Sequence, residues 1–182
     1  RRLAKDHFWT DKIFNYIGWK HILEDHAGTL PVLIKAIPEG TKVNNDNVLM
    51  TVESTCERCF WVPSYLETIL CQLWYPCTVA TISNHVRKII LDGLKKSGNP
   101  DLIDFKLHDF GFRGASSVES AGIGGLAHLI NFKGTDTLAA LRCGNEFYGY
   151  EMPGFSIPAT EHSVITSWTK AREVNAFENL LD

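Results

Sequence analysis

Three short segments of the sequence carry polar side chains that could act together on a substrate. Arg113 lies in the segment 105–114, Asp136 in the segment 134–137 and His162 in the segment 158–163. Each segment reads as the end of a strand, a sharp loop and the start of a helix. Because parallel strands end at one edge of a sheet, we expect the three loops to surround one pocket. This combination of side chains predicts an enzyme site.

His162 and Asp136 each allow a structural and a chemical interpretation. We expect His162 in the first turn of a helix, where the helix dipole favours neutral imidazole and attracts phosphate. A neutral imidazole there could attack phosphate or act as a general base, or it could simply hydrogen-bond the turn. Asp136 lies at the start of another predicted helix. The favoured interpretation of it is a carboxylate that complements the dipole of that helix. The same carboxylate could accept a hydrogen bond from a substrate amide.

Arg113 and Phe110 have the same two kinds of explanation. Arg113 lies between Gly111 and Gly114, and an arginine on such a loop suits bidentate contact with phosphate. Its structural alternative is a salt bridge at the surface. Phe110, at the end of a predicted strand, could pack in the core or offer its ring face to an aromatic ligand.

The elements expected to position these residues alternate between strand and helix. We predict strands at 105–110, 128–132 and 155–158, followed by helices from Ser116 (capped with Glu119), over 135–147 and over 161–180. This alternation predicts parallel strands with right-handed crossovers, in an open sheet or a (β/α) barrel. A barrel needs about eight such units. The barrel interpretation therefore implies that this sequence is incomplete.

The first third of the chain has a less regular pattern. Apolar spacing predicts a helix over 8–24, and short apolar runs predict strands at 33–37 and 48–52. Later helices are expected from Pro63, with a capping box of Ser64 and Glu67, and over 79–96. We therefore divide the chain into a partial β-rich domain, 1–62, and a region 63–182. The second region holds a helical lead-in and the first βα units of a barrel-like catalytic domain, which makes the fold class α/β.

Composition excludes several classes of protein. The chain has 182 residues, of which 45% are hydrophobic and 21% charged, and its net charge of −3 does not favour nucleic-acid binding. No apolar run approaches the roughly 18 residues of a membrane span, and the amino end does not resemble a signal peptide. The chain starts with Arg1 and Arg2 instead of methionine, so we expect it to be a segment of a longer protein.

Cysteines and glycines suggest two further motifs that we interpret structurally. The five cysteines form no regular framework, which favours reduced thiols in a cytoplasmic protein. Cys56 and Cys59 have zinc-knuckle spacing, but no second close pair follows, so an incidental loop pair is favoured over a metal site. The glycine-rich run 122–125 lacks the lysine of a phosphate loop, so we expect it to allow close packing of helices.

Several of these segments together resemble the nicotinamide phosphoribosyltransferases. The shared motifs are KLHDFGFRG at 106–114 with Ser116, Ser117 and Glu119, AGIG at 121–124, AHL at 127–129, NFKGTDT at 131–137, IPATEHS at 157–163, PEG at 38–40 and WYPCTVAT at 74–81. They extend over nearly the whole chain. The resemblance implies transfer of phosphoribose from phosphoribosyl pyrophosphate to nicotinamide, giving nicotinamide mononucleotide and pyrophosphate in NAD salvage.

The resemblance also implies roles for individual residues. His162 matches a histidine that ATP phosphorylates and, with Arg113, a diphosphate-binding position. Asp136 matches the carboxylate that holds the carboxamide and disfavours nicotinate. Phe110 matches the aromatic ring that stacks on the pyridine. Ser156 and His108 match residues that line the pocket, and they are the last two residues of the expected site.

Cofactors and partners follow from the same resemblance. Magnesium accompanies the pyrophosphate, although no ligand for it can be named in this chain, and ATP is a co-substrate. The active site is expected at the interface of a homodimer, where the partner supplies a second aromatic ring. Later barrel strands and the family's amino-terminal segment are not in this sequence, so we expect the 182-residue chain alone to lack full activity.

Two alternatives remain open at this point. A nicotinate-type phosphoribosyltransferase would have the same fold and a different base. A catalytically silent homologue would keep the fold as an interaction or signalling module, although the presence of Arg113, Asp136 and His162 argues against it.

Overall fold

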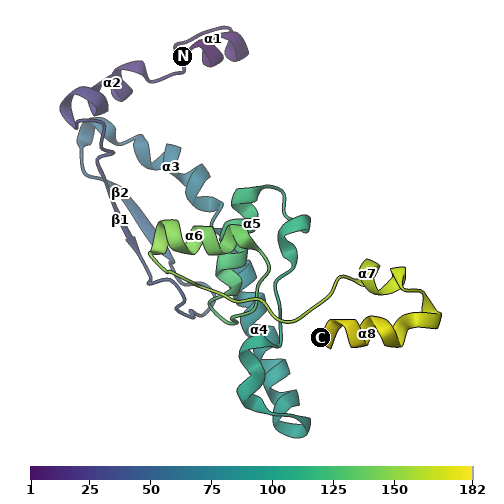
Figure 1. The fold of residues 1–182 in the computed structure, drawn as a ribbon. Helices are drawn as coiled ribbons and strands as arrows, with labels where there is room; N and C mark the ends of the chain where they lie inside the picture. The colour runs from purple at the N-terminus through teal and green to yellow at the C-terminus, as the bar shows by residue number, and fades with distance from the viewer. Residues whose placement is uncertain (182) are drawn as a thin grey trace. The chain divides into compact units, whose positions relative to one another are not determined.

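The computed structural model describes residues 1–181, which form two compact units. The first unit comprises residues 1–75, and the second begins at residue 76 (Figure 1). The structure is α/β and mostly helical. The predicted division after residue 62, between a β-rich piece and a catalytic domain, remains a prediction about domains.

The first unit is built on one antiparallel pair of strands. Its elements are α1 (Arg2–Phe8), α2 (Tyr16–Asp25), β1 (Val32–Ala36), β2 (Met50–Ser54), the 3-10 helix η1 (Glu57–Cys59) and α3 (Val62–Cys71). Val32 pairs with Ser54 and Ala36 with Met50. Ile22, Cys59 and Val62 are the buried centre of this unit, so its core lies between α2, η1 and the start of α3. Both strands predicted in this region are confirmed within two residues.

The predicted helices of the first unit need two corrections. A single helix over 8–24 is wrong, because Trp9 has a left-handed backbone conformation (φ 56°) and ends α1. The side chain of Asn15 then accepts a hydrogen bond from the amide of Gly18 and caps α2. The capping box at Ser64 is also wrong. Helix α3 already starts at Val62, because Pro63 needs no hydrogen-bonded amide in the first turn.

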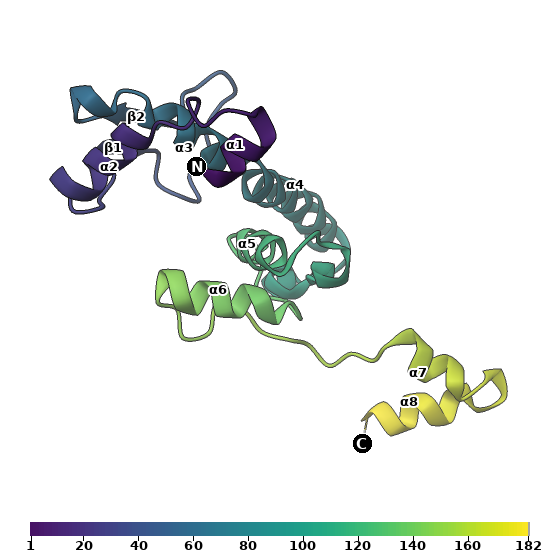
Figure 2. The ribbon, with the colours of Figure 1, turned by 90° about the horizontal axis from the view of Figure 1, so that it is seen from above.

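The second unit contains most of the helices. They are α4 (Trp74–Ser97), η2 (Pro100–Phe105), η3 (Gly111–Gly114), α5 (Val118–His128), α6 (Leu138–Tyr148), α7 (His162–Ser167), η4 (Lys170–Arg172) and α8 (Glu173–Leu181). Helices α5 and α6 lie side by side in both views (Figures 1 and 2). A Cβ on Gly125 would lie 2.7 Å from Cβ of Ala140, so the prediction that these glycines allow close helix packing is confirmed.

The three predicted parallel strands are reduced to single bridges. Asp109 pairs with Thr135, Gly134 pairs with Phe155, and both bridges are parallel. The predicted parallel pairing of these segments is therefore present. The predicted strands at 105–110, 128–132 and 155–158 are nevertheless wrong. Helix α5 continues to His128, and the buried Phe132 stacks on its ring at 5.1 Å, so 128–132 form a helix end and a turn.

The helix starts near the expected site also differ from prediction. Ser117, not Ser116, caps α5 by accepting a hydrogen bond from the amide of Ser120. Helix α6 begins at Leu138, so Asp136 lies before the helix instead of in its first turn. The last predicted helix is divided into α7 and α8, because Thr169 has φ 63° and interrupts it.

Over residues 1–181, no helix is both long enough and apolar enough to cross a membrane. All five cysteines are free, as predicted.

Candidate active site

Backbone hydrogen bonds hold three separate segments next to one another. The amide of Asp109 donates to the carbonyl of Gly134 over 3.1 Å, and the amide of Asp136 donates to the carbonyl of Asp109 over 3.0 Å. On the other side, the amide of Thr135 donates to the carbonyl of Phe155 over 2.9 Å. Because the bridges are parallel, residues that follow each of them lie at one edge. This edge brings together the residues described next.

Asp136 is the centre of this group. The hydroxyl of Ser156 donates a hydrogen bond to its Oδ1 over 2.5 Å, and Nε2 of His108 lies 3.2 Å from the same oxygen. The hydrogen bond from Ser156, and then the contact with His108, hold the pKa of Asp136 below its usual value. Asp136 is therefore ionised at neutral pH. Its side chain is 40% exposed, so this anionic acceptor is accessible from outside.

His108 is held beside Asp136 by close packing. Its side chain is only 6% exposed, and neither ring nitrogen has a hydrogen bond of normal geometry within the described residues. A Cβ on Gly134 would lie 2.6 Å from its Nδ1, so only glycine leaves room for the ring. The ring of Phe110 lies 4.5 Å from that of His108, tilted by 38°, and Phe110 is 56% exposed. We call His108, Phe110, Asp136 and Ser156 the strand-end cluster.

Asp109 holds the loops of this cluster together through hydrogen bonds, a role that was not predicted from the sequence. Its Oδ1 accepts a hydrogen bond from the amide of Gly111 over 2.8 Å, and its Oδ2 accepts one from the hydroxyl of Thr135 over 3.1 Å. The hydroxyl of Thr135 accepts in turn from the amide of Thr137. An aspartate two residues before a glycine is a known turn signal, so Asp109 could have been recognised.

His128 holds in place the backbone that leads into the strand-end cluster. Its Nε2 lies 3.1 Å from the carbonyl of Leu107, and its Nδ1 lies 2.8 Å from the hydroxyl of Ser83 on α4. Burial lowers the pKa of His128, so the ring is neutral near pH 7. A neutral ring that donates to Leu107 must accept from Ser83. This chain of contacts fixes the backbone directly before His108.

His162 pairs with Glu161 at the start of α7, and Arg113 acts on Glu161 through its charge. One carboxylate oxygen of Glu161 accepts from the amide of Ser163 over 2.6 Å and caps α7, while the other lies 2.7 Å from Nδ1 of His162. The hydrogen bonds of Ser163 chiefly lower the pKa of Glu161, and the charges of His162 and Arg113 add to the effect. Arg113 on η3 is therefore close enough to influence the start of α7. The side chain of His162 is 84% exposed.

The six predicted site residues thus fall into two sets. Direct contacts join His108, Phe110, Asp136 and Ser156, whereas Arg113 and His162 are linked through the charge of Glu161. Glu161 was not predicted to take part, although an acidic residue before a histidine at a helix start is visible in the sequence. The chemical roles given to these residues remain predictions.

Magnesium finds no set of protein ligands around this edge. Within residues 1–181, the one group of three or more candidate ligands lies in the first unit and consists of two histidines and two cysteines. Sulfur and imidazole donors do not suit magnesium, which prefers oxygen ligands and phosphate. The described residues therefore do not fit a magnesium site formed by this chain alone.

Comparisons with known proteins agree with the motifs. A model of the nicotinate phosphoribosyltransferase family matches residues 105–182. A nicotinamide phosphoribosyltransferase of Xanthomonas campestris pv. campestris is 54% identical over 92% of this chain, which covers 36% of that relative. One of Acinetobacter baylyi is 36% identical over 91% of this chain and 34% of its own length. The chain spans about a third of the length of these curated relatives.

Proposed function

Because the chain belongs to the family of the nicotinamide phosphoribosyltransferases, we propose that the protein transfers phosphoribose from phosphoribosyl pyrophosphate to nicotinamide. The products are nicotinamide mononucleotide and pyrophosphate, in NAD salvage. The observation that carries this proposal is the strand-end cluster. It combines an accessible aromatic ring with an ionised carboxylate, the two groups that recognition of an aromatic amide requires.

Phe110 and Asp136 would hold the base. The exposed ring of Phe110 can stack on the pyridine, and Asp136 can accept a hydrogen bond from the carboxamide N–H. Ser156 already occupies one oxygen of Asp136, which orients the carboxylate. The negative charge of Asp136 would repel the carboxylate of nicotinate, so the site selects the amide by attraction and by repulsion together.

Arg113 would bind the diphosphate of the donor, together with His162. Arginine suits this task because its planar group makes paired hydrogen bonds with phosphate oxygens. Positive charge near the departing pyrophosphate stabilises it as its bond to the ribose breaks. Its position on the exposed 3-10 helix η3, directly after Phe110, would place the diphosphate beside the base.

His162 would be phosphorylated by ATP. Its Nδ1 faces the carboxylate of Glu161, which favours a proton on Nδ1 and leaves the lone pair on Nε2. Attack by Nε2 on the γ-phosphorus forms a nitrogen–phosphorus bond, and the bond to the bridging oxygen breaks to release ADP. Hydrolysis of this phosphohistidine would drive an otherwise unfavourable condensation. The exposed position of His162 is compatible with this transfer.

Four further proposals concern the whole protein. We expect a (β/α) barrel in which the parallel bridges of this chain continue into strands, a homodimer with the active site at its interface, and magnesium bound mainly by pyrophosphate oxygens. A cytoplasmic location fits the free cysteines. These proposals rest on the family and on the short parallel pairing seen here.

The test uses the full-length protein that contains this chain. We expect it to form nicotinamide mononucleotide from nicotinamide and phosphoribosyl pyrophosphate, and to prefer nicotinamide to nicotinate in competition. Preference for nicotinate would support the nicotinate-type alternative instead. No turnover with either base, and no binding of phosphoribosyl pyrophosphate, would favour the silent interaction module.

A second experiment tests the phosphohistidine. ATP labelled with phosphorus-32 on the γ-phosphate should transfer its label to the protein in an alkali-stable, acid-labile form. His162→Ala should remove this label. His85→Ala is the matched control, because His85 is exposed on α4 and should leave the label unchanged. A label that survives in His162→Ala would show that another residue is phosphorylated.

A further inference from the structure

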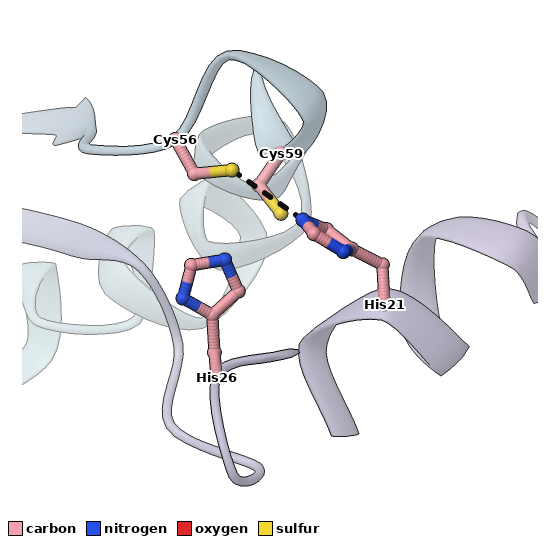
Figure 3. A group of neighbouring side chains, drawn as sticks. All are labelled: His21, His26, Cys56 and Cys59. Carbon is pink, nitrogen blue, oxygen red and sulfur yellow. Dashed lines mark hydrogen bonds between the residues drawn. The ribbon is translucent and has the colours of Figure 1, made fainter. Parts of the chain in front are cut away.

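Two histidines and two cysteines of the first unit converge on one point. They are His21 in α2, His26 directly after it, and Cys56 and Cys59 at the 3-10 helix η1 that follows β2. One ligand atom from each lies within 4.8 Å of the others, and Nε2 of His21 is 3.5 Å from Sγ of Cys56. Figure 3 shows the four side chains pointing toward one another.

We propose that His21, His26, Cys56 and Cys59 bind one zinc ion as a structural site. Two sulfur and two imidazole donors in a tetrahedral arrangement are typical of zinc. With zinc bonds of about 2.0–2.3 Å, tetrahedral ligand atoms lie roughly 3.3–3.8 Å apart. The present spacing, up to 4.8 Å, needs only a small contraction to reach that geometry.

A second set of contacts prepares His21 as a ligand. Its Nδ1 pairs with the carboxylate of Asp25, one helical turn later, so its Nε2 faces the cysteines. Histidine ligands of zinc commonly have a carboxylate on the other ring nitrogen, which sets the tautomer and the ring orientation. Arg58, between the two cysteines in sequence, lies 3.9 Å from Asp25 and adds to this outer set of contacts.

The environment favours zinc over an incidental cluster. Cys59 is fully buried and packs with Ile22 and Val62, so one ligand belongs to the core itself. Holding these four side chains together costs each of them conformational freedom, and coordination of a metal ion would offset that cost.

The zinc would hold the first unit together. It would join the carboxyl end of α2 to the segment between β2 and α3, which are thirty residues apart in the sequence at their nearest ligands, His26 and Cys56. All four coordination positions are protein atoms, which is the pattern of a structural site and leaves none for substrate. In the sequence, Cys56 and Cys59 form a single close pair of cysteines. The two histidines supply the missing half of the site.

The full-length protein, purified under reducing conditions, tests the proposal by its metal content. We expect inductively coupled plasma mass spectrometry to find about one zinc ion per chain. Cys56→Ser and His26→Gln should each reduce the zinc content to near background; both positions are only partly buried, so the fold should tolerate them. Cys77→Ser and His7→Gln are matched controls, because both residues are exposed and lie outside the cluster.

A measurement on the unmodified protein avoids the risk that a variant misfolds. Removal of zinc by a strong chelator should lower the Tm, and added zinc should restore it. Cobalt(II) in place of zinc should give the intense visible absorption of a tetrahedral site with thiolate ligands. Wild-type protein without zinc and without a response to added zinc would overturn the proposal. So would a Cys56–Cys59 disulfide in freshly purified protein, or undiminished zinc in the double variant Cys56→Ser, His26→Gln.

Discussion

Ser156 donates a hydrogen bond to Asp136 over 2.5 Å, although the two residues are twenty positions apart in the sequence. The parallel bridge between Gly134 and Phe155 makes this contact possible, because it places the residues after each bridge side by side. The result is a carboxylate whose direction and charge are both fixed before any substrate arrives. Preorganisation of this kind reduces the cost of binding an amide.

Replacing Asp136 by Asn should weaken the discrimination between nicotinamide and nicotinate. The ratio of kcat/KM for the amide to kcat/KM for the acid should fall by about ten- to a hundredfold, which corresponds to a charged hydrogen bond and a lost repulsion. Competition between the two bases in the full-length enzyme measures this ratio. Asp101→Asn, at an exposed aspartate of η2, is the control. If Asp136→Asn keeps the wild-type preference for nicotinamide over nicotinate, Asp136 does not recognise the carboxamide group.

Replacing Ser156 by Ala should raise the pKa of Asp136 toward its usual value, because the hydrogen bond from Ser156 is the main cause of its lowering. A lowered pKa keeps the carboxylate ionised as pH falls below 3.8, so the variant should protonate at higher pH than the wild type. The KM for nicotinamide should also rise by about two- to tenfold. Carbon-13 NMR titration of Asp136 measures the pKa directly. An unchanged titration would mean that this hydrogen bond does not persist in solution.

Local sequence signals predicted the elements that local interactions build. The runs at 33–37 and 48–52 became β1 and β2 with small shifts, because each is bounded by turn residues and pairs with its neighbour along the chain. The helix over 8–24 failed because Trp9, in a left-handed conformation, ends α1 and Asn15 caps a new helix, α2, in spite of the apolar spacing. Parallel pairing was predicted from the alternation of elements. The length of the parallel pairing was not predicted, because it depends on tertiary contacts such as the stacking of Phe132 on His128.

The strand-end cluster was only partly predictable for a similar reason. Its members were suggested by position at strand ends and by resemblance, but the pairing of Ser156 with Asp136 depends on register. His128 was missed because its partner Ser83 lies 45 residues away in sequence, whereas Asp109, two residues before Gly111, carried a local turn signal. The histidine–cysteine group was missed because His21 and Cys56 are 35 positions apart. Spacing rules detect ligand pairs within a loop and not pairs joined by folding.

Replacing Gly134 by Ala should disturb His108 specifically. The added Cβ would lie 2.6 Å from Nδ1 of that ring, so the ring or the bridge must move. We expect a loss of about 1–3 kcal/mol in unfolding free energy and weaker nicotinamide binding. Gly93→Ala is the matched control, because nothing lies within 4 Å of its Cβ in α4. That variant should be neutral or up to about 1 kcal/mol more stable. Equal behaviour of the two variants in chemical denaturation and base binding would contradict the proposed packing.

Replacing Asp104 by Asn should destabilise the second unit and reduce its sensitivity to acid. Asp104 lies 2.7 Å from Nη2 of Arg87 and 3.0 Å from Nζ of Lys133, and both contacts lower its pKa, that of Arg87 more. Arg87 also donates to the carbonyl of Asn131, so the ion pair connects α4 to the turn before Gly134. Because these side chains are partly exposed, we expect a loss of only about 1–2 kcal/mol at pH 7.

The pH dependence gives this prediction its sign. A carboxyl group whose pKa is lower in the folded state stabilises the protein above its unfolded value, near 3.8, and loses that contribution as pH falls toward the folded value. The difference in stability between wild type and Asp104→Asn should therefore be constant above about pH 5 and should shrink in more acidic solution. Denaturant unfolding at several pH values measures it, with Asp92→Asn as a control at an exposed aspartate of α4. A difference that stays constant down to the lowest pH at which the protein folds would show that the charge of Asp104 does not stabilise this junction.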